Sequence, residues 1–228
     1  MYRYLLIDFD NTLMDFTKTE HLALIKAVKD CCGRDIGAAE TALYHRINDS
    51  YWKRLERREV TREQLKFGRF SDFTQAIGIT DTDVNVLNKY YMDCLSGTSV
   101  EYPDSFAACR ELAERYDLYI ITNGTTYIQK ARLEGTTFKN YIKKMFISDE
   151  IGADKPAPAF FEPVVKEIGD TDLRHYLVVG DSVSSDILFG RKVGIDTCFV
   201  GQEGSGADYT IAGIGELPEL LRRIEGKM

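Results

Sequence analysis

Short apolar runs that end in polar turns alternate with longer amphipathic stretches through most of the chain. The first run predicts a buried strand over Tyr4–Phe9, where a continuous apolar segment leads into a polar turn. Later runs predict strands at residues 118–121, 145–148, 176–179, 197–200 and 209–212. The stretches between them predict helices, one of them capped by Ser184 or Ser185. This alternation is typical of a parallel sheet with right-handed crossovers.

Residues 15–97 break the alternation. Apolar residues recur there at helical spacing, as Leu22, Ile25 and Val28 do, and glycines stand where helices would end. We interpret this stretch as a bundle of about four helices. The pattern therefore predicts a Rossmann-like, doubly wound α/β core formed by residues 1–14 and 98–228, with an α-helical insertion at residues 15–97.

The composition excludes several classes of protein. Of 228 residues, 29 are Lys or Arg and 36 are Asp or Glu, and the formal charge of -7 disfavours binding to a nucleic-acid polymer. The hydrophobic content of 44% is that of a folded globular chain, and no apolar run approaches the roughly 18 residues of a membrane span. Because the first residues do not resemble a secretory signal, we expect a cytoplasmic protein with no membrane partner and with five reduced, mostly buried cysteines.

Polar side chains directly follow three of the expected strands. They are Asp8 and Asp10 after the first strand, Thr122 and Asn123 after the second, and Asp181 after the strand at 176–179. Ligands of a parallel α/β sheet bind at the carboxyl ends of its strands, so we expect these side chains to lie together.

The acidic residues of this set require a cation. With Asp186, which follows Asp181 by five residues, four carboxylates would converge. Two unit charges about 4 Å apart repel by on the order of 4 kcal/mol at an effective dielectric constant of about 20. Mg²⁺ fits this set, because it prefers oxygen ligands and binds through one or two carboxylates together with phosphate. Lys155, which Pro156 holds in an extended loop, supplies a further positive charge.

These groups are together suited to a phosphoryl group. A metal ion, a lysine, a strand-end threonine and the N–H groups of an Asn-Gly turn neutralise phosphoryl oxygens as charge shifts in the transition state. One carboxylate can attack phosphorus to form an aspartyl-phosphate. Another can donate a proton to the leaving oxygen and later remove one from water.

The same residues resemble the haloacid dehalogenase superfamily of phosphatases in four motifs that follow the family's order. The motifs are Asp8-Phe9-Asp10-Asn11-Thr12-Leu13, Thr122-Asn123-Gly124, Lys155-Pro156, and Gly180-Asp181-Ser182 with Asp186. The resemblance implies that Asp8 is the nucleophile and Asp10 the general acid/base. It also implies that the phosphoryl group is bound by Thr122, the Asn123 backbone and Lys155, and that Lys155 steadies the nucleophile as well. The implied Mg²⁺ ligands are Asp8, the Asp10 main-chain carbonyl and Asp181, with Asp186 supporting the metal.

The resemblance also gives the helical insertion a role. In this family the position between the first two motifs holds a mobile helical cap, here of the C1 type, which excludes water and selects substrates. Dehalogenating members lack an acid at the position of Asp10, so its presence favours phosphate chemistry. Phe16 and Trp52 are candidates for stacking on a substrate base.

A narrower resemblance points to a substrate. The segments 10–16, 120–124, 132–134, 147–150 and 152–156 are similar to the pyrimidine 5′-nucleotidase subgroup, which implies a small-molecule phosphate monoester, a nucleoside 5′-monophosphate, as partner. Two alternatives stay open. One is a sugar-phosphate phosphatase or phosphomutase of the same fold, and the other is a non-catalytic sensor of a phosphate ligand.

Overall fold

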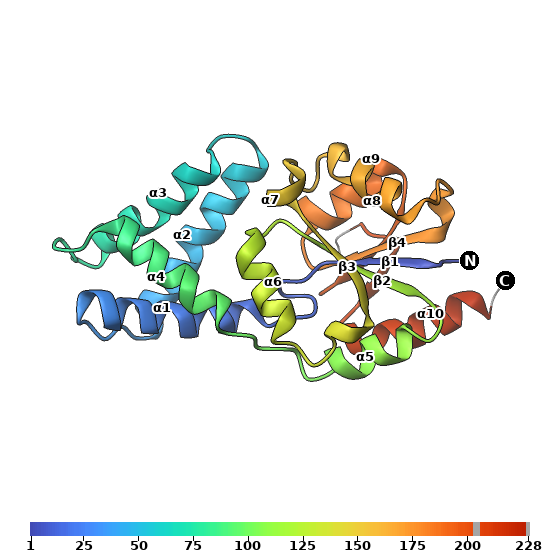
Figure 1. The fold of residues 1–228 in the computed structure, drawn as a ribbon, viewed down its shortest axis with the longest axis horizontal. Coiled ribbons are helices and arrows are strands. Elements are labelled where there is room, and N and C mark those ends of the chain that lie inside the picture. The colour runs from blue at the N-terminus through green and yellow to red at the C-terminus, as the bar shows by residue number, and fades with distance from the viewer. Residues whose placement is uncertain (203–205, 227–228) are drawn as a thin grey trace. The chain divides into compact units, whose positions relative to one another are not determined.

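The protein divides into two compact units. The computed structural model describes residues 1–202 and 206–226. One unit comprises Met1–Asp15 and Val100–Met228, and the other comprises Phe16–Ser99. The first unit is an α/β sheet domain and the second is helical (Figure 1).

The sheet has the strand order of a Rossmann-like domain. In the described part of the chain its six strands are all parallel and lie in the order β3-β2-β1-β4-β5-β6. They are β1 (Tyr4–Ile7), β2 (Asp117–Thr122), β3 (Ile142–Ile147), β4 (Tyr176–Gly180), β5 (Asp196–Val200) and β6 (Tyr209–Ile211). The order places β1 between β2 and β4, which confirms the predicted doubly wound sheet.

Helices cover both faces of this sheet. They are α5 (Ser105–Leu112), α6 (Thr126–Glu134), α7 (Ser148–Ile151), α8 (Phe161–Ile168), α9 (Leu188–Val193) and α10 (Leu217–Glu225). Figure 1 shows α5 and α10 on one face and α8 and α9 on the other. Side chains on each strand alternate between these layers: Leu5 and Ile7 pack with α5 and α10, whereas Leu6 packs with α8 and α9. Burial of both faces explains the continuous apolar runs in the sequence.

The helical unit consists of four helices within its described residues, as the sequence predicts. They are α1 (Phe16–Cys32), α2 (Ala38–Glu56), α3 (Arg62–Ala76) and α4 (Val84–Ser96). An aromatic cluster forms its centre, with the ring of Tyr44 lying 5.0 Å from Phe70 and 5.5 Å from Tyr91 between centroids. The unit also buries the charged side chains of Glu20 and Arg69.

Two expectations from the sequence were wrong. Ser182, rather than Ser184 or Ser185, caps the segment after β4, because its side chain accepts a hydrogen bond from the Ser185 N–H at 3.2 Å. The first turn of that segment, Val183–Ile187, is π-helical. The cysteines are all free, but only Cys109 and Cys198 are buried, so most of them are not buried as expected.

Across residues 1–202 and 206–226, no helix has both the length and the apolar character that crossing a membrane requires.

Candidate active site

The predicted polar residues meet where three neighbouring strands end. The register pairs Ile7 of β1 with Ile120 of β2 and with Val179 of β4. Asp8 therefore extends from the central strand, and Thr122 and Asp181 end or follow the strands on either side. The carboxyl edge of the sheet thus gathers residues that lie more than a hundred positions apart in the sequence.

Lys155 lies at the centre of the site. Its Nζ donates hydrogen bonds to Asp8 Oδ1 at 2.7 Å, to Asp186 Oδ1 at 2.6 Å and to the Ile121 carbonyl at 2.8 Å. The side chains of Lys155 and Asp186 are each 1% exposed, so the ion pair is shielded from water. An ammonium has three protons, and these three acceptors use all of them. In this arrangement Lys155 offers a ligand its positive charge rather than a free proton for a hydrogen bond.

Burial and crowding of charge shift the pKa values of these groups. Burial raises the pKa of Asp8 well above its usual range; Lys155 opposes this effect, while the Asp186 and Asp181 carboxylates add to it. Burial followed by the Asp186 charge raises the pKa of Asp181 to about 7. Burial alone would lower the pKa of Lys155, but the charges of Asp186 and Asp8 outweigh it and raise the pKa above its usual value. The site holds more negative charge than its lysine offsets.

Three of the carboxylates lie close enough together to hold a metal ion. Oxygen atoms of Asp8, Asp181 and Asp186 all lie within 4.8 Å of one another. A set of hard oxygen donors with excess negative charge fits a divalent cation such as Mg²⁺. Asp186 also accepts hydrogen bonds from Lys155 and, at 3.1 Å, from the Ser182 N–H, so its carboxylate already has partners. Asp181 accepts one from Thr12 Oγ1 at 3.4 Å.

Asp10 points away from this set toward α6. The chain turns at Asn11, whose φ of 60° lies in the left-handed region that asparagine tolerates. Asp10 Oδ1 accepts a hydrogen bond from the guanidinium of Arg132 at 2.5 Å, and Oδ2 accepts one from Gln129 Nε2 at 2.7 Å. Sequence reasoning did not assign a role to Gln129 or Arg132. Their spacing of three residues on a helix that begins just after a motif-bearing strand was the signal that could have identified them.

Thr122 and Asn123 are placed by hydrogen bonds with different partners. The Thr122 hydroxyl accepts from Gln129 Nε2 at 2.8 Å and from the Gly124 N–H at 3.2 Å. Two accepted bonds leave the hydroxyl proton to be donated, for instance to a phosphoryl oxygen. The Asn123 side chain exchanges two bonds with the Lys155 backbone, each of 2.8 Å, and so fixes the loop that carries the lysine.

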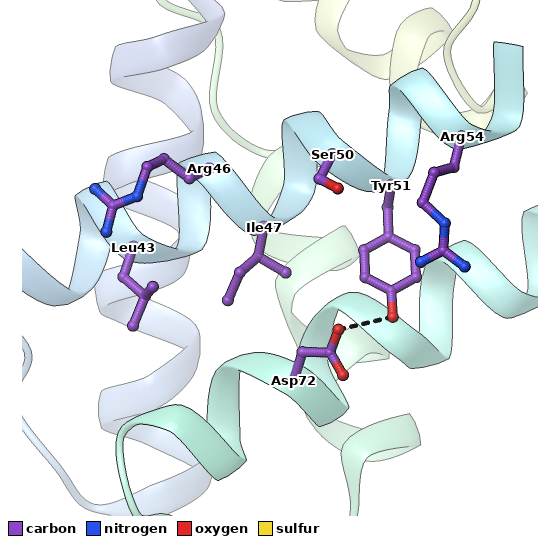
Figure 2. Close-up of a pocket in the computed structure, with 7 residues that line it drawn as sticks. All are labelled: Leu43, Arg46, Ile47, Ser50, Tyr51, Arg54 and Asp72. Atoms are coloured by element: carbon purple, nitrogen blue, oxygen red, sulfur yellow. Dashed lines mark hydrogen bonds between the residues drawn. The ribbon is translucent and has the colours of Figure 1, made fainter. Parts of the chain in front are cut away.

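The two aromatic candidates lie in the helical unit. Phe16 begins α1, and Trp52 packs in α2 against an apolar cluster that includes Tyr51 and Leu55. A pocket of about 260 Å³ lies between α2 and α3 in this unit, and Figure 2 shows the side chains that line it. Neither Phe16 nor Trp52 lines it; its walls are Leu43, Arg46, Ile47, Ser50, Tyr51, Arg54 and Asp72. Tyr51 donates a hydrogen bond of 2.9 Å to Asp72 across it. A role for Phe16 and Trp52 in substrate binding stays a prediction.

Comparison with known proteins agrees with the fold. The model of the haloacid dehalogenase-like hydrolases matches residues 2–194. The HAD-hydrolase YfnB of Bacillus subtilis is 32% identical over 201 residues, which are 87% of this chain and 84% of YfnB. A crystal structure of YfnB bound to magnesium superposes with a TM-score of 0.90 at 30% identity, covering 96% of this chain and 98% of that one.

Two further relatives are named for an enzymatic activity. The pyrimidine 5′-nucleotidase PynA of Streptococcus pneumoniae is 34% identical over 197 residues, which are 86% of this chain and 82% of PynA. The pyrimidine 5′-nucleotidase YjjG of Escherichia coli is 28% identical over 184 residues, which are 78% of this chain and 80% of YjjG.

Proposed function

This chain belongs to the haloacid dehalogenase-like hydrolases, and we propose that it is a Mg²⁺-dependent phosphomonoesterase that acts on nucleoside 5′-monophosphates, pyrimidine nucleotides among them. The observation that carries the proposal is the gathering of Asp8, Thr122 and Lys155 with two further carboxylates at one edge of the sheet. This set combines a nucleophile, a hydroxyl donor and a fixed positive charge.

The proposed reaction has two steps, formation of an aspartyl-phosphate and its hydrolysis. In the first, a carboxylate oxygen of Asp8 attacks phosphorus, and the bond from phosphorus to the ester oxygen breaks. That oxygen takes a proton from Asp10 and leaves as the alcohol. In the second, water attacks the aspartyl-phosphate and gives a proton to the Asp10 carboxylate. The bond to Asp8 breaks, its electron pair returns to the carboxylate, and inorganic phosphate is released.

The other polar residues bind and orient the phosphoryl group. The Thr122 hydroxyl and the Asn123 N–H donate hydrogen bonds to its oxygens, and the charge of Lys155 offsets theirs. Lys155 also holds the Asp8 carboxylate, through the bond of 2.7 Å to Oδ1. When bound, Mg²⁺ would be held by Asp8, Asp181 and the Asp10 main-chain carbonyl, with support from Asp186, and would neutralise charge on the phosphoryl oxygens.

The names of two relatives support a nucleotide substrate. PynA and YjjG, both called pyrimidine 5′-nucleotidases, share 34% and 28% identity over most of the chain. We propose that residues 15–97 act as the substrate-selecting cap and that Phe16 and Trp52 contribute to contact with the base.

Replacement of the nucleophile tests the mechanism. The Asp8→Asn variant should lose turnover of 4-nitrophenyl phosphate while keeping the circular dichroism spectrum of the parent. The matched control is Asp93→Asn, which alters an exposed carboxylate of α4. Parental activity in Asp8→Asn would overturn the assignment of the nucleophile.

A panel of esters tests the substrate. The parent with Mg²⁺ should release inorganic phosphate from UMP and dTMP faster than from sugar phosphates. Faster release of phosphate from a sugar phosphate would indicate a sugar-phosphate phosphatase instead of a nucleotidase. Formation of an isomer without phosphate release would indicate a mutase. Binding of phosphate without turnover of any ester would indicate a non-catalytic sensor of a phosphate ligand.

A further inference from the structure

We propose that Gln129 and Arg132 are positioning residues that hold the carboxylate of Asp10 in the orientation needed for proton transfer to and from the ester and water oxygens. The proposal rests on the phosphomonoesterase function above, and it assigns a task to a part of α6 that the sequence motifs leave without one. Both residues contact the Asp10 carboxylate directly, so the task proposed for them is exerted through Asp10.

The geometry fixes both oxygens of Asp10. Arg132 donates to Oδ1 at 2.5 Å and Gln129 donates to Oδ2 at 2.7 Å. Two donors on the two oxygens of one carboxylate determine the plane of the group as well as its position. A carboxylate has about four lone-pair sites, so these two bonds still leave a lone pair on each oxygen to carry the transferred proton.

The two donors are themselves held in place. Arg132 donates a second hydrogen bond to Gln129 Oε1 at 2.9 Å, and its guanidinium lies 5.1 Å from the centre of the Phe9 ring. Arg132 is fully buried and Gln129 is 1% exposed. A buried guanidinium is costly unless a carboxylate compensates it, and Asp10 is the carboxylate paired with Arg132 here. Rigid donors are what a group needs if its orientation is to be reproducible.

Gln129 also joins the acid/base to the phosphate-binding residue. Its Nε2 lies 2.7 Å from Asp10 Oδ2 and 2.8 Å from Thr122 Oγ1. The amide thus sets the distance between the group that transfers the proton and the hydroxyl that would bind the phosphoryl oxygen. Gly124 makes room for it, because a Cβ at that position would lie 2.4 Å from Gln129 Nε2.

The dependence of rate on the leaving group separates this task from a merely structural one. An alkoxide such as the 5′-oxygen of a nucleoside leaves only when protonated, whereas 4-nitrophenolate leaves without a proton. Loss of orientation at Asp10 should therefore slow formation of the aspartyl-phosphate from a nucleotide much more than from the aryl ester. The attack of water on the aspartyl-phosphate is common to both esters. Damage to the fold or to phosphate binding would slow both esters equally.

The experiment compares kcat/KM, which reports formation of the aspartyl-phosphate, for dTMP and 4-nitrophenyl phosphate in this chain with Mg²⁺. For Arg132→Met we expect kcat/KM on dTMP to fall by about 30-fold or more and kcat/KM on the aryl ester by about threefold or less. The Gln129→Met variant removes no charge, so it remains usable if Arg132→Met fails to fold, and about a tenfold loss on dTMP is expected. Arg132→Lys should recover part of the loss. The matched control is Lys130→Met on the same helix, where an exposed side chain pairs with Glu150.

The outcomes are distinct. Equal losses of kcat/KM on both esters, or parental values in Gln129→Met and Arg132→Met, would overturn the positioning role while leaving the phosphomonoesterase intact. A parent that hydrolyses neither ester would overturn the proposed function and this proposal with it.

Discussion

Lys155 and Asp186 form a buried ion pair, with Nζ lying 2.6 Å from Oδ1 and each side chain 1% exposed. The same ammonium binds Asp8 Oδ1 at 2.7 Å. One lysine therefore holds two carboxylates from different strand ends, and it connects the stability of the sheet edge to the placement of the proposed nucleophile.

Removal of Lys155 should destabilise the folded state. The Lys155→Met variant leaves Asp8 and Asp186 buried without their shared cation, and breaking a buried pair in this way costs about 3–5 kcal/mol. Urea unfolding of the metal-free protein, followed by circular dichroism, measures the change. The double variant with Asp186→Asn should recover part of the loss, because it removes one of the two unpaired charges.

An exposed ion pair provides the comparison. Lys89 pairs with Asp93 on α4, where the side chains are 78% and 52% exposed. Lys89→Met should leave the urea midpoint of unfolding close to that of the parent, because water solvates and salt screens an exposed pair. If Lys155→Met were no more destabilising than Lys89→Met, the buried pair would contribute nothing beyond a surface pair.

A methyl group at Gly124 should disturb the site without changing a functional side chain. A Cβ there would lie 2.4 Å from Nε2 and 2.5 Å from Cδ of Gln129, so the amide must move off Asp10 and Thr122. We expect Gly124→Ala to lose about 1–3 kcal/mol of stability by overpacking and to lower kcat on dTMP. Thermal unfolding and steady-state kinetics check the two effects.

Gly213→Ala is the control for the Gly124→Ala substitution. Its φ of -165° is ordinary extended backbone, and a Cβ there would meet no atom within 4 Å. Gly213→Ala should leave activity unchanged and stability within about 1 kcal/mol of the parent. Similar losses in both alanine variants would contradict the steric argument at Gly124.

The sequence predicts the sheet edge well because one rule determines it. Continuous apolar strands identify a parallel sheet, and the polar residue after each strand then falls at a known edge, as Asp8, Thr122 and Asp181 do. The contacts of Asp10 with Gln129 and Arg132 depend instead on how α6 packs, and a strand-end rule contains no such information. For the same reason the pairing of Lys155 with Asp186 was not predicted.

Local geometry at the fourth motif also escaped prediction. Three serines in the segment 182–185 are equivalent cap candidates by residue type, and the choice of Ser182 follows from the π-helical turn that begins at Val183. That turn brings Asp186 back to the sheet edge, where a Cβ on Gly180 would lie 2.3 Å from its carboxylate. Propensities of single residues do not encode such a close approach.

Affinity for Mg²⁺ should fall as the pH is lowered. The pKa of Asp181 in the metal-free site is about 7, raised by burial and then by Asp186, so below that pH a proton occupies a proposed ligand. Metal must displace this proton, and each pH unit below 7 should weaken the apparent affinity by up to about tenfold. Titration calorimetry with MgCl₂ at pH 6, 7 and 8, in buffers of different ionisation enthalpy, measures affinity and proton release together. Affinity that is constant over this range would show that Asp181 does not exchange a proton for the metal, and Asp181→Asn provides the reference.

A second pH dependence should arise in the helical unit from His45. Its Nδ1 lies 2.7 Å from Glu20 Oε2, where the Glu20 side chain is 4% exposed and that of His45 is 48% exposed. The hydrogen bond to Glu20 raises the pKa of His45 above its usual value, against the smaller opposing effect of burial. Protonated His45 therefore stabilises the folded state. The contribution is fully present below the unfolded-state pKa of about 6.5 and is lost as the pH rises through the higher folded-state pKa.

The measurement is a difference between two proteins, because many other groups titrate over the same range. Urea unfolding of the parent and of His45→Gln between pH 5.5 and 8.5 should give a stability difference that is largest at low pH. Its size should stay below about 1 kcal/mol, since half of the imidazole is in water. Glu20 has a second partner in Asn48 Nδ2 at 2.6 Å, so its carboxylate keeps a donor when His45 is replaced. A difference that is independent of pH, or that grows as the pH rises, would mean that the imidazolium form of His45 on α2 does not stabilise the packing against Glu20 on α1.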